Sequence, residues 1–431
     1  MKIMLVGSGG REHALAWKMA QSPLLTELVL VPGNDAMENL ASDKLRITRI
    51  KQTSADDVMA LAKLAESCKP DLVVIGPENA LADGLADKLN DLGLDVFGPS
   101  AAAAKLEASK AFTKDFCQRY SIPAARSKTV SNENEANDYL DSLSAPYVLK
   151  ADGLAAGKGV VIVEDLIEAK ASAKQMLDGQ FGAASSRLVI EEFLTGEEAS
   201  LFVLCDGKTA MPMAGAQDHK RAFDGDTGPN TGGMGCYSPA PILDDAMTDK
   251  VMQQIVQPTL AGMVERGTPF SGVLYVGLMI DNNQPKLIEY NVRFGDPECQ
   301  VLMLRLQSDL IPALLACAKG KLAALEPLFW DQRAAACVVM AANGYPGIVS
   351  KGSIITGIEQ ASISPEVKVF HAGTKISANG EVSANGGRVL NITASGDDLS
   401  KAVANCYAGV ELINWSQGFY RKDIGWRALG K

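Results

Sequence analysis

The chain has 431 residues, of which 47% are hydrophobic and 21% are charged, and its formal net charge is −10 at pH 7. This length predicts roughly two to four domains. The acidic balance argues against a nucleic-acid or anionic-membrane surface, although local basic pockets for phosphates remain compatible with it. Eight cysteines without a CxxC pair, and only three histidines, argue against a disulfide scaffold and a zinc framework. Met1 leads directly into an apolar strand and no run of about 18 apolar residues occurs, so we expect a cytoplasmic protein without a signal peptide.

The first part of the chain, residues 1–104, alternates apolar runs with helical stretches. The four runs are 2–6, 28–31, 71–75 and 96–97, and the last three end in Gly- or Pro-containing turns. This alternation predicts a parallel sheet covered by helices, with ligands bound at the carboxyl ends of the strands.

The turn after the first strand contains a GxG pattern at Gly7–Gly9. Glu12 replaces the third glycine of a dinucleotide fingerprint, and the second strand is not followed by a ribose-binding acid. We therefore interpret Gly9 and Gly10 as a helix N-terminus offered to one phosphate group, with Arg11 as a helper. A purely structural tight turn is the alternative.

A second unit, starting after Pro123, contains the glycine-rich stretch 150–160. Apolar runs flank it on both sides, which predicts a hairpin of two strands. Three glycines can bring backbone N–H groups close to a ligand, and two lysines add positive charge, which suits a polyphosphate; these residues are Gly153, Gly157, Gly159, Lys150 and Lys158. The spacing differs from a P-loop, and an ordinary glycine-rich hairpin is the alternative.

A single helix is expected from Ala101 to about Tyr120. Lys110 and Lys114 lie four residues apart on one face of it, where two solvated lysines are the usual explanation. Further on, residues 217–235 contain many charged residues and glycines and few apolar ones. A loop of this length inside a domain is usually functional or disordered, and its composition favours a substrate-contacting loop.

A second hairpin is predicted at 277–293, with its turn at Asn282-Asn283. Strand alternation places Glu289, Asn291 and Arg293 on one face. Two oxygen ligands beside a guanidinium suit a hard cation that carries phosphate, whereas a plain exposed edge strand is the alternative. From about residue 326, short strands and one helix predict a small α+β domain.

Together these segments resemble the glycinamide ribonucleotide synthetase family of ATP-grasp ligases over essentially the whole chain. The resemblance rests on the order and spacing of many motifs: GSGGREHALAWK, VIGPE, FGPS, SKAFTKDF, KADGLAAGKGV, IEEFLTGEEAS, QDHKR, DTGPNTGGMGCYSPAP, IEYNVRFGDPECQ, FHAGTK, NGGRVL and RKDIGWRA. It implies an α/β and α+β multidomain fold. Residues 1–104 would form a Rossmann-like N-terminal domain, 105–325 an ATP-grasp domain with a mobile lid lobe at about 123–190, and 326–431 a C-terminal α+β domain.

The resemblance also implies the reaction. ATP, glycine and 5-phosphoribosylamine would give glycinamide ribonucleotide, ADP and phosphate through a glycyl phosphate intermediate, in purine biosynthesis. Magnesium is the implied cofactor, with manganese as a possible substitute, and ATP is a co-substrate. The implied partners are these small molecules, without nucleic acid, membrane or an obligate protein partner.

The family's site residues transfer to this chain by motif. Nucleotide contacts are implied for Lys110, Lys150, Gly153, Gly157, Lys158, Gly159, Glu191, Glu192, Phe193, Leu194 and Glu198. Substrate contacts are implied for Gly9, Gly10, Arg11, Glu78, Asp218, Gly233, Arg293 and Lys375. Magnesium ligands are implied at Glu289 and Asn291, and direct catalytic roles at Asp218, Arg293 and Lys150.

One departure from the wider superfamily concerns the metal. Many ATP-grasp enzymes carry an acid on the strand before Glu289, whereas this chain has Gly277 and Met279 there, which leaves the place of any second magnesium ion open. Three other functions are alternatives. The RFGDPE and PNTGGMG segments disfavour a carboxylase that uses bicarbonate, and the incomplete dinucleotide fingerprint disfavours a dinucleotide-dependent oxidoreductase. The retained lysines disfavour an inactive nucleotide-binding protein.

Overall fold

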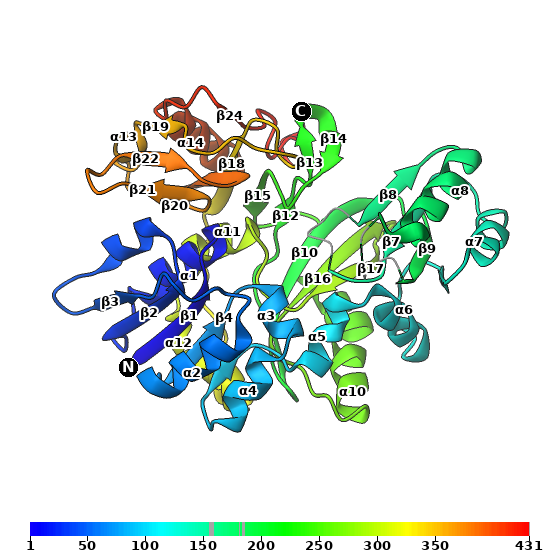
Figure 1. The fold of residues 1–431 in the computed structure, drawn as a ribbon, viewed down its shortest axis with the longest axis horizontal. Coiled ribbons are helices and arrows are strands. Elements are labelled where there is room, and N and C mark those ends of the chain that lie inside the picture. The colour runs from blue at the N-terminus through cyan, green and yellow to red at the C-terminus, as the bar shows by residue number, and fades with distance from the viewer. Residues whose placement is uncertain (155–158, 181, 183–185, 431) are drawn as a thin grey trace.

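The computed structural model describes residues 1–154, 159–180, 182 and 186–430 (Figure 1). The N-terminal part is a parallel sheet of order β3-β2-β1-β4-β5, which confirms the expected architecture. Its strands are β1 (Lys2–Gly7), β2 (Glu27–Pro32), β3 (Arg46–Arg49), β4 (Leu72–Ile75) and β5 (Val96–Phe97). Its helices are α1 (Gly10–Met19), η1 (Asp35–Leu40), α2 (Val58–Cys68), α3 (Glu78–Ala82) and α4 (Leu85–Asp91). Strand β3 was not expected, because its sequence RITR is polar and partly exposed and lacks an apolar run.

The helix expected at 101–120 is two helices, α5 (Ala101–Ala108) and α6 (Lys110–Arg119). Ser109 between them is extended, with φ −134° and ψ 111°, and its Oγ accepts a hydrogen bond from the Phe112 N–H. A serine that caps a new helix in this way ends the preceding one. The expectation of a single helix is therefore wrong, and Lys110 becomes the first residue of α6.

The lobe that stands apart on the right of Figure 1 is an antiparallel sheet of order β6-β9-β7-β8 with α7 and α8. Its elements are β6 (Ser127–Val130), α7 (Glu133–Leu140), β7 (Tyr147–Ala151), β8 (Val160–Val163), α8 (Leu166–Gln175), η2 (Met176–Gln180) and β9 (Leu188–Glu192). Strands β7 and β8 pair from Tyr147↔Val163 to Lys150↔Val160, which confirms the predicted hairpin. The lobe has its own hydrophobic core, which includes Leu140, Leu149 and Ile190.

The central sheet has the order β11-β10-β16-β17. Its elements and the helices beside it are β10 (Glu197–Asp206), β11 (Ala210–Pro212), α9 (Asp245–Val251), η5 (Met252–Val256), α10 (Gln257–Glu265), β16 (Ser271–Asp281), β17 (Gln284–Asn291), α11 (Glu298–Arg305), α12 (Leu310–Ala318) and η6 (Leu322–Ala324). Asn282 and Asn283 both have positive φ, at 47° and 59°. Two successive left-handed residues form the tight turn that suits the twist of a hairpin, as the sequence predicted.

The C-terminal part contains a six-stranded sheet that follows the order β12-β15-β18-β23-β20, with β24 pairing β18, and a small sheet β19-β22-β21. Its elements are β18 (Ala334–Ala342), β19 (Ile354–Ile355), α13 (Ile358–Ala361), β20 (Val367–His371), β21 (Thr374–Ile376), β22 (Val382–Ala384), β23 (Arg388–Gly396), α14 (Leu399–Glu411) and β24 (Gly418–Phe419).

The segment expected as one long substrate loop, 217–235, contains short strands. They are β12 (Gln217–Asp218), β13 (Arg221–Phe223) and β14 (Thr227–Asn230), with the 3-10 turn η4 (Asp224–Asp226), and β15 (Gly235–Ser238) follows. Strands β12 and β15 join the C-terminal sheet through the pairing of β15 with β18. The segment is thus folded against the C-terminal domain, which a local reading of its composition could not show.

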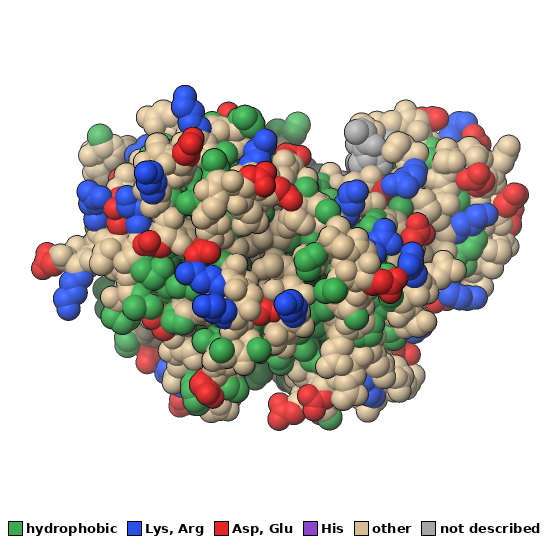
Figure 2. All heavy atoms as spheres, turned by 90° about the horizontal axis from the view of Figure 1, so that it is seen from below, with side chains coloured by type: hydrophobic (Ala, Val, Ile, Leu, Met, Phe, Trp, Pro, Cys, Tyr) green, Lys and Arg blue, Asp and Glu red, His purple; other side chains and the backbone are tan. Residues whose placement is uncertain are grey.

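None of the helices in the described ranges is long and apolar enough to cross a membrane. On the face in Figure 2, basic and acidic side chains are interspersed rather than gathered by sign.

Two buried histidines join the N-terminal helix α1 to strand β20. The backbone N–H of His371 donates to His13 Nδ1 at 2.9 Å, and the two rings are 5.8 Å apart. Asn34 Nδ2 donates to the carbonyl of His371 at 2.9 Å. Burial lowers the pKa of His371 to about 4, and burial together with the neighbouring His371 lowers the pKa of His13 to about 3.

These histidines predict a loss of stability in mild acid. The unfolded chain takes up protons below the ordinary pKa of 6.5, whereas the folded chain resists until about pH 4 or lower. The free energy of unfolding should therefore fall as pH drops from 6.5, by roughly 1.4 kcal/mol per pH unit for each histidine. His13→Asn keeps an acceptor for the His371 N–H and should reduce this slope, as measured by urea unfolding at about pH 7.5 and about pH 5. Equal slopes in the two proteins would contradict the assignment.

Candidate functional site

A buried carboxylate between two lysines lies at the junction of α6, β7 and β9. Glu191 is 2.9 Å from Lys114 Nζ and 3.0 Å from Lys150 Nζ, and the three side chains are at most 8% exposed. Burial opposes ionisation of Glu191, but the two ammonium groups outweigh it and lower the pKa of this carboxyl. The interpretation of Lys114 as a solvated lysine is wrong, because its partner comes from a strand almost eighty residues away.

Asp152 connects the end of β7 to the start of α6. Its Oδ1 accepts hydrogen bonds from Ser109 Oγ at 2.9 Å and from the Ala111 N–H at 3.1 Å, and Arg187 lies 2.6 Å from its Oδ2. A carboxylate is favourable at a helix N-terminus, where backbone N–H groups lack partners. Asp152 therefore fixes the position of Lys110 relative to Lys150.

The glycine-rich stretch is described at its two ends. Lys110 Nζ donates to the carbonyl of Gly153 at 2.9 Å, and the carbonyl of Gly159 accepts from the Ala151 N–H at 2.8 Å. Gly157 and Lys158 lie outside the described residues. Lys110 and Lys150 thus both lie beside the opening of this stretch.

The residues that follow Glu191 lie at the edge of the same lobe. The Glu192 carboxylate faces outward, where it accepts from the backbone N–H and Nε of Arg126. Strand β9 ends at Glu192, and Phe193 is 40% exposed. The backbone of Glu192 is still paired within the sheet, opposite Tyr147, and Phe193 and Leu194 follow the end of the strand.

Three charged side chains from separate elements meet over the central sheet. Lys220 Nζ lies 3.0 Å from Glu198 Oε2 and 3.8 Å from Glu289 Oε1. Burial opposes ionisation of Glu289, but Lys220, Lys150 and Lys110 outweigh it and lower the pKa of this carboxyl. Lys220 was missed by sequence reasoning, although its place in the polar QDHKR motif was a signal.

Glu289 and Asn291 occupy alternate positions of β17, so their oxygens share one face. Gly277, on the neighbouring strand β16, pairs with Glu289 and has no side chain that could add a metal ligand. Among the described residues, no cluster of three His, Cys, Asp or Glu side chains could hold a metal by itself. Two protein oxygens fit a magnesium ion that takes its other ligands from phosphate and water.

Asp218 and Glu298 form a second acidic group, at the end of β12 and the start of α11. Asp218 Oδ1 is buried and has no hydrogen-bond partner among the described residues. Burial, with the nearby Glu298 next in effect, raises the pKa of Asp218 well above its ordinary value. Gly233 has φ +111°, and a Cβ there would lie 2.9 Å from Asp218 Oδ1. A buried carboxyl without a partner is suited to an ammonium group of a ligand.

Arg293, just after β17, bridges two acids from the N-terminal part of the chain. It lies 3.2 Å from Glu78 and 3.1 Å from Glu107. Although burial opposes it, Arg293 and Arg11 lower the pKa of Glu78 to about 2. Glu107 was another residue that sequence reasoning missed, since nothing local marks it.

The Gly9–Arg11 turn already has partners within the chain. The Gly9 N–H donates to Glu12 Oε2 at 2.7 Å, and Arg11 Nε donates to Glu12 Oε1 at 2.5 Å. Arg11 Nη1 also donates to the carbonyl of Phe294 at 3.1 Å. These bonds attach the turn to the RFGDPE segment that contains Arg293.

Two C-terminal cations contribute differently. Arg388 Nη1 donates to the carbonyls of Gly232 at 2.7 Å and Asp296 at 2.5 Å, so it joins segment 217–235 to the RFGDPE segment. Lys375 is exposed on β21, next to Ile376, whose N–H donates to Asp35.

The C-terminal segment also contacts His219, the residue after Asp218. Gly425 N–H donates to His219 Nε2 at 2.9 Å, and the fully buried Arg421 pairs with Asp226 at 2.7 Å. Arg427 also pairs with Asp226. These contacts fix segment 219–226 from the C-terminal side.

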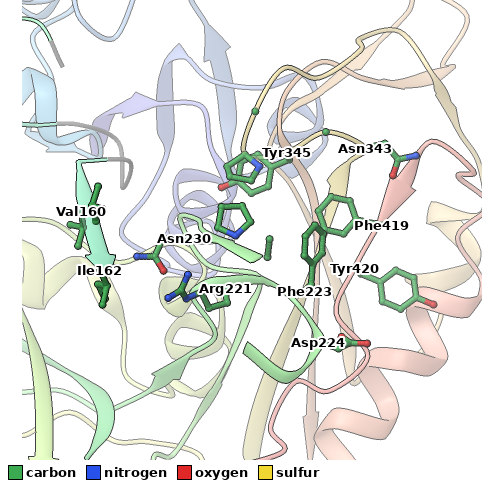
Figure 3. Close-up of a pocket in the computed structure, with 16 residues that line it drawn as sticks. Val160, Ile162, Arg221, Phe223, Asp224, Asn230, Asn343, Tyr345, Phe419 and Tyr420 are labelled. Carbon is green, nitrogen blue, oxygen red and sulfur yellow. The ribbon is translucent and has the colours of Figure 1, made fainter. Parts of the chain in front are cut away.

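A cavity of about 1140 Å³ opens between β8, the β13–β14 hairpin and the C-terminal domain (Figure 3). Phe223, Tyr345 and Phe419 line one side and Val160 and Ile162 the other. None of the predicted site residues is among its described lining residues. Glu198, Asp218 and Lys220 line instead a much smaller cavity against the central sheet, together with Gly277.

Comparison with known proteins agrees with this arrangement. The phosphoribosylglycinamide synthetase N domain matches residues 1–107, its ATP-grasp (A) domain residues 108–299, and its C domain residues 335–427. A phosphoribosylamine–glycine ligase from Caulobacter vibrioides is 56% identical over 100% of this chain and 99% of its own length. A chloroplastic one from Arabidopsis thaliana is 51% identical over 97% of this chain and 79% of its own length.

Solved structures show the same likeness. The crystal structure of phosphoribosylamine–glycine ligase from Thermotoga maritima has a TM-score of 0.84 and 31% identity, and covers 99% of this chain and 100% of its own. A biotin carboxylase domain from Hydrogenobacter thermophilus, solved with MgADP, has a TM-score of 0.72 at 16% identity, covers 97% and 91% of the two chains, and shares the fold alone. The matched domains and the full-length relatives show that this chain belongs to the phosphoribosylglycinamide synthetase family.

Proposed function

We propose that this protein joins glycine to 5-phosphoribosylamine at the expense of ATP and releases glycinamide ribonucleotide, ADP and phosphate. Its full-length relatives are named for that reaction. The observation that carries the proposal is the set of lysines beside two buried or half-buried acids: Lys114 and Lys150 lie 2.9 and 3.0 Å from Glu191, and Lys220 lies 3.8 Å from Glu289. Such a set matches the charge of a polyphosphate and of a transferring phosphoryl group.

The nucleotide would lie between the lobe and the central sheet. Lys110 and Lys150 would contact its phosphates, and the stretch that contains Gly153, Gly157, Lys158 and Gly159 would close over them. The backbone after Glu191, at Glu192, Phe193 and Leu194, would hold the adenine, and Glu198 the ribose hydroxyls. We propose magnesium, replaceable by manganese, at Glu289 and Asn291, where it would neutralise phosphate charge.

The acceptor substrates would lie toward the C-terminal domain. Asp218 Oδ1, which has no hydrogen-bond partner among the described residues and lies beside Gly233, would receive the ammonium group of glycine. Arg293 and Glu78 would face the phosphoribosyl group, next to Gly10. Gly9 and Arg11 would act on it by fixing the RFGDPE segment, and Lys375 would lie at the rim.

The chemistry follows from the poor reactivity of a carboxylate, whose leaving group would be oxide. A glycine carboxylate oxygen attacks the γ-phosphorus of ATP, and ADP leaves. The amine nitrogen of phosphoribosylamine then attacks the carbonyl of glycyl phosphate, loses a proton, and expels phosphate, which carries away one glycine oxygen. No cysteine nucleophile is required, and seven of the eight cysteines are buried.

The domain limits that we propose are 1–104, 105–325 with a mobile lid lobe at about 123–190, and 326–431. We also propose a cytoplasmic enzyme whose partners are its small-molecule substrates. The direct test is an assay with ATP and phosphoribosylamine in which glycine is compared with bicarbonate. Product and ADP should form with glycine alone, whereas consumption of bicarbonate would favour a carboxylase.

Glu289→Gln should slow turnover by roughly a hundredfold and raise the magnesium concentration required, because the amide lacks the charge that holds the metal. The magnesium dependence of ADP formation checks this. Glu359→Gln, on the surface of the C-terminal domain, is the matched control and should behave as the parent. A parent-like magnesium requirement in Glu289→Gln would exclude Glu289 as a ligand.

Asp152→Ala should raise the KM for ATP and lower the free energy of unfolding by about 1–3 kcal/mol, since it leaves Ser109 and the Ala111 N–H without their acceptor. Asp152→Asn keeps that acceptor and should lie between the parent and the alanine variant. Steady-state kinetics and urea unfolding measure both effects. The KM for glycine should not change, and a selective rise in it would refute this role.

The bond of ATP that breaks separates an acyl phosphate route from an adenylate route. Glycine labelled with oxygen-18 in its carboxylate should pass one labelled oxygen to the phosphate released during synthesis, because the γ-phosphoryl is the group exposed to attack. Mass spectrometry of the released phosphate measures the transfer. Label in AMP, or unlabelled phosphate while product forms, would contradict the glycyl phosphate intermediate.

A further inference from the structure

The motif RKDIGWRA, near the C-terminus, meets segment 217–235 at a cluster of charges to which the proposed function gives no role. Arg421 is fully buried, and its Nη1 donates to Asp226 Oδ1 at 2.7 Å. Its Nη2 donates to Asp423 Oδ2, also at 2.7 Å, and Arg427 pairs with Asp226 from the other side. Two guanidinium groups thus face two carboxylates, so the cluster is electrically balanced, as charges removed from water must be.

Hydrogen bonds between the two segments run in both directions. Arg421 Nη1 donates to the carbonyl of Arg221 at 3.2 Å, in addition to Asp226. In return, the Gly225 N–H donates to Asp423 Oδ2 at 2.8 Å. Because donors and acceptors lie on both segments, a displacement of Arg421 would also displace the chain that follows Asp218.

His219 carries this connection to the residue next to Asp218. The imidazole is completely buried, and burial lowers its pKa, so the ring is neutral. Its Nε2 accepts from the Gly425 N–H at 2.9 Å, which leaves the ring proton on Nδ1. Nδ1 lies 3.9 Å from Asp226 Oδ1. The ring therefore lies between the C-terminal segment and the charge cluster.

The chain stays extended past the end of β12. The His219 N–H donates to the carbonyl of Gly235, and the Met234 N–H donates to the carbonyl of His219, both at 2.9 Å. Side chains of an extended chain alternate between its two faces. Asp218 and Lys220 accordingly line the small cavity over the central sheet, whereas His219 points to the C-terminal side.

We propose that His219 and Arg421 are positioning residues for glycine, and that the C-terminal segment sets the affinity for glycine by fixing the backbone of Asp218. The inference rests on the proposed function, in which Asp218 receives the glycine ammonium group. A single methylene separates the Asp218 carboxylate from the backbone, so a backbone shift moves the carboxylate directly. The four methylenes of Lys220 can absorb the same shift, so the nucleotide side of the cleft is less sensitive.

His219→Leu removes the acceptor of the Gly425 N–H. Because a misplacement of about 1 Å is costly, the KM for glycine should rise by roughly tenfold or more, with the KM for ATP within about twofold of the parent. His219→Gln can place an oxygen near the position of Nε2 and should recover most of the affinity for glycine. Steady-state kinetics with each substrate varied in turn measure both constants. Equal rises in the two KM values, or the same KM for glycine in the Leu and Gln variants, would overturn the proposal.

Arg421→Met tests the charge cluster from a position about two hundred residues away in sequence. It should also raise the KM for glycine selectively. Asn405→Ala is the matched control, because it removes a hydrogen bond to the Ser395 carbonyl within the same domain. It should lower the free energy of unfolding without changing the KM for glycine. A parent-like KM for glycine in folded Arg421→Met would overturn the proposal, and the two His219 variants decide it if Arg421→Met does not fold.

The same assays separate this inference from the proposed function. A parent protein that forms no product from glycine would refute the proposed function itself. A parent that forms product, together with variants whose KM for glycine is unchanged, would refute only the positioning role of the C-terminal segment.

Discussion

The balance between buried cations and their acidic partners is the physical constraint on which the site depends. Lys150 pairs with Glu191, Lys220 with Glu198, and Arg293 with Glu78 and Glu107. Holding like charges close together in a partly desolvated cleft is unfavourable unless an anion joins them. The whole chain carries a charge of −10, so attraction for phosphate comes from this local arrangement and not from the net charge.

The fold maintains the arrangement by joining elements that are distant in sequence. Asp152 connects the lobe to α6, and Glu12 with Arg11 attaches the first βα turn to the segment of Arg293. On the other side, strands β12 and β15 belong to the C-terminal sheet, and Arg388 donates a hydrogen bond to Gly232 of segment 217–235. Each domain therefore contributes contacts that position the charged residues, which explains why the motifs are spread over the entire chain.

Much of this could be predicted from the sequence, because it depends on local patterns. Apolar runs placed the strands of the parallel sheet, the apolar flanks of the glycine-rich stretch placed the β7–β8 hairpin, and strand alternation put Glu289 and Asn291 on one face. The rest depended on partners far away in the chain. The sequence predicts a solvated Lys114 on a helix, because it does not show that Glu191, on the distant strand β9, is its partner.

Two further expectations were wrong, one for a local reason and one for a long-range reason. The break at Ser109 is a capping interaction that a run of good helix formers hides. Segment 217–235 was interpreted as a loop because its short strands are stabilised by pairing with the C-terminal sheet rather than by their own sequence. The expectation that Arg11 helps to bind a phosphate stays a prediction, and the structure adds that its guanidinium is paired with its neighbour, Glu12.

Glu191 shows why a phosphate site can include a buried acid. A buried Lys150 without an acidic partner would be costly, and Glu191 offsets that cost. A simple pair, however, would be neutral and would attract phosphate weakly. Lys114 changes this balance, because two ammonium groups against one carboxylate leave one net positive charge. The triad therefore stabilises Lys150 before the nucleotide arrives and still presents a positive charge to it.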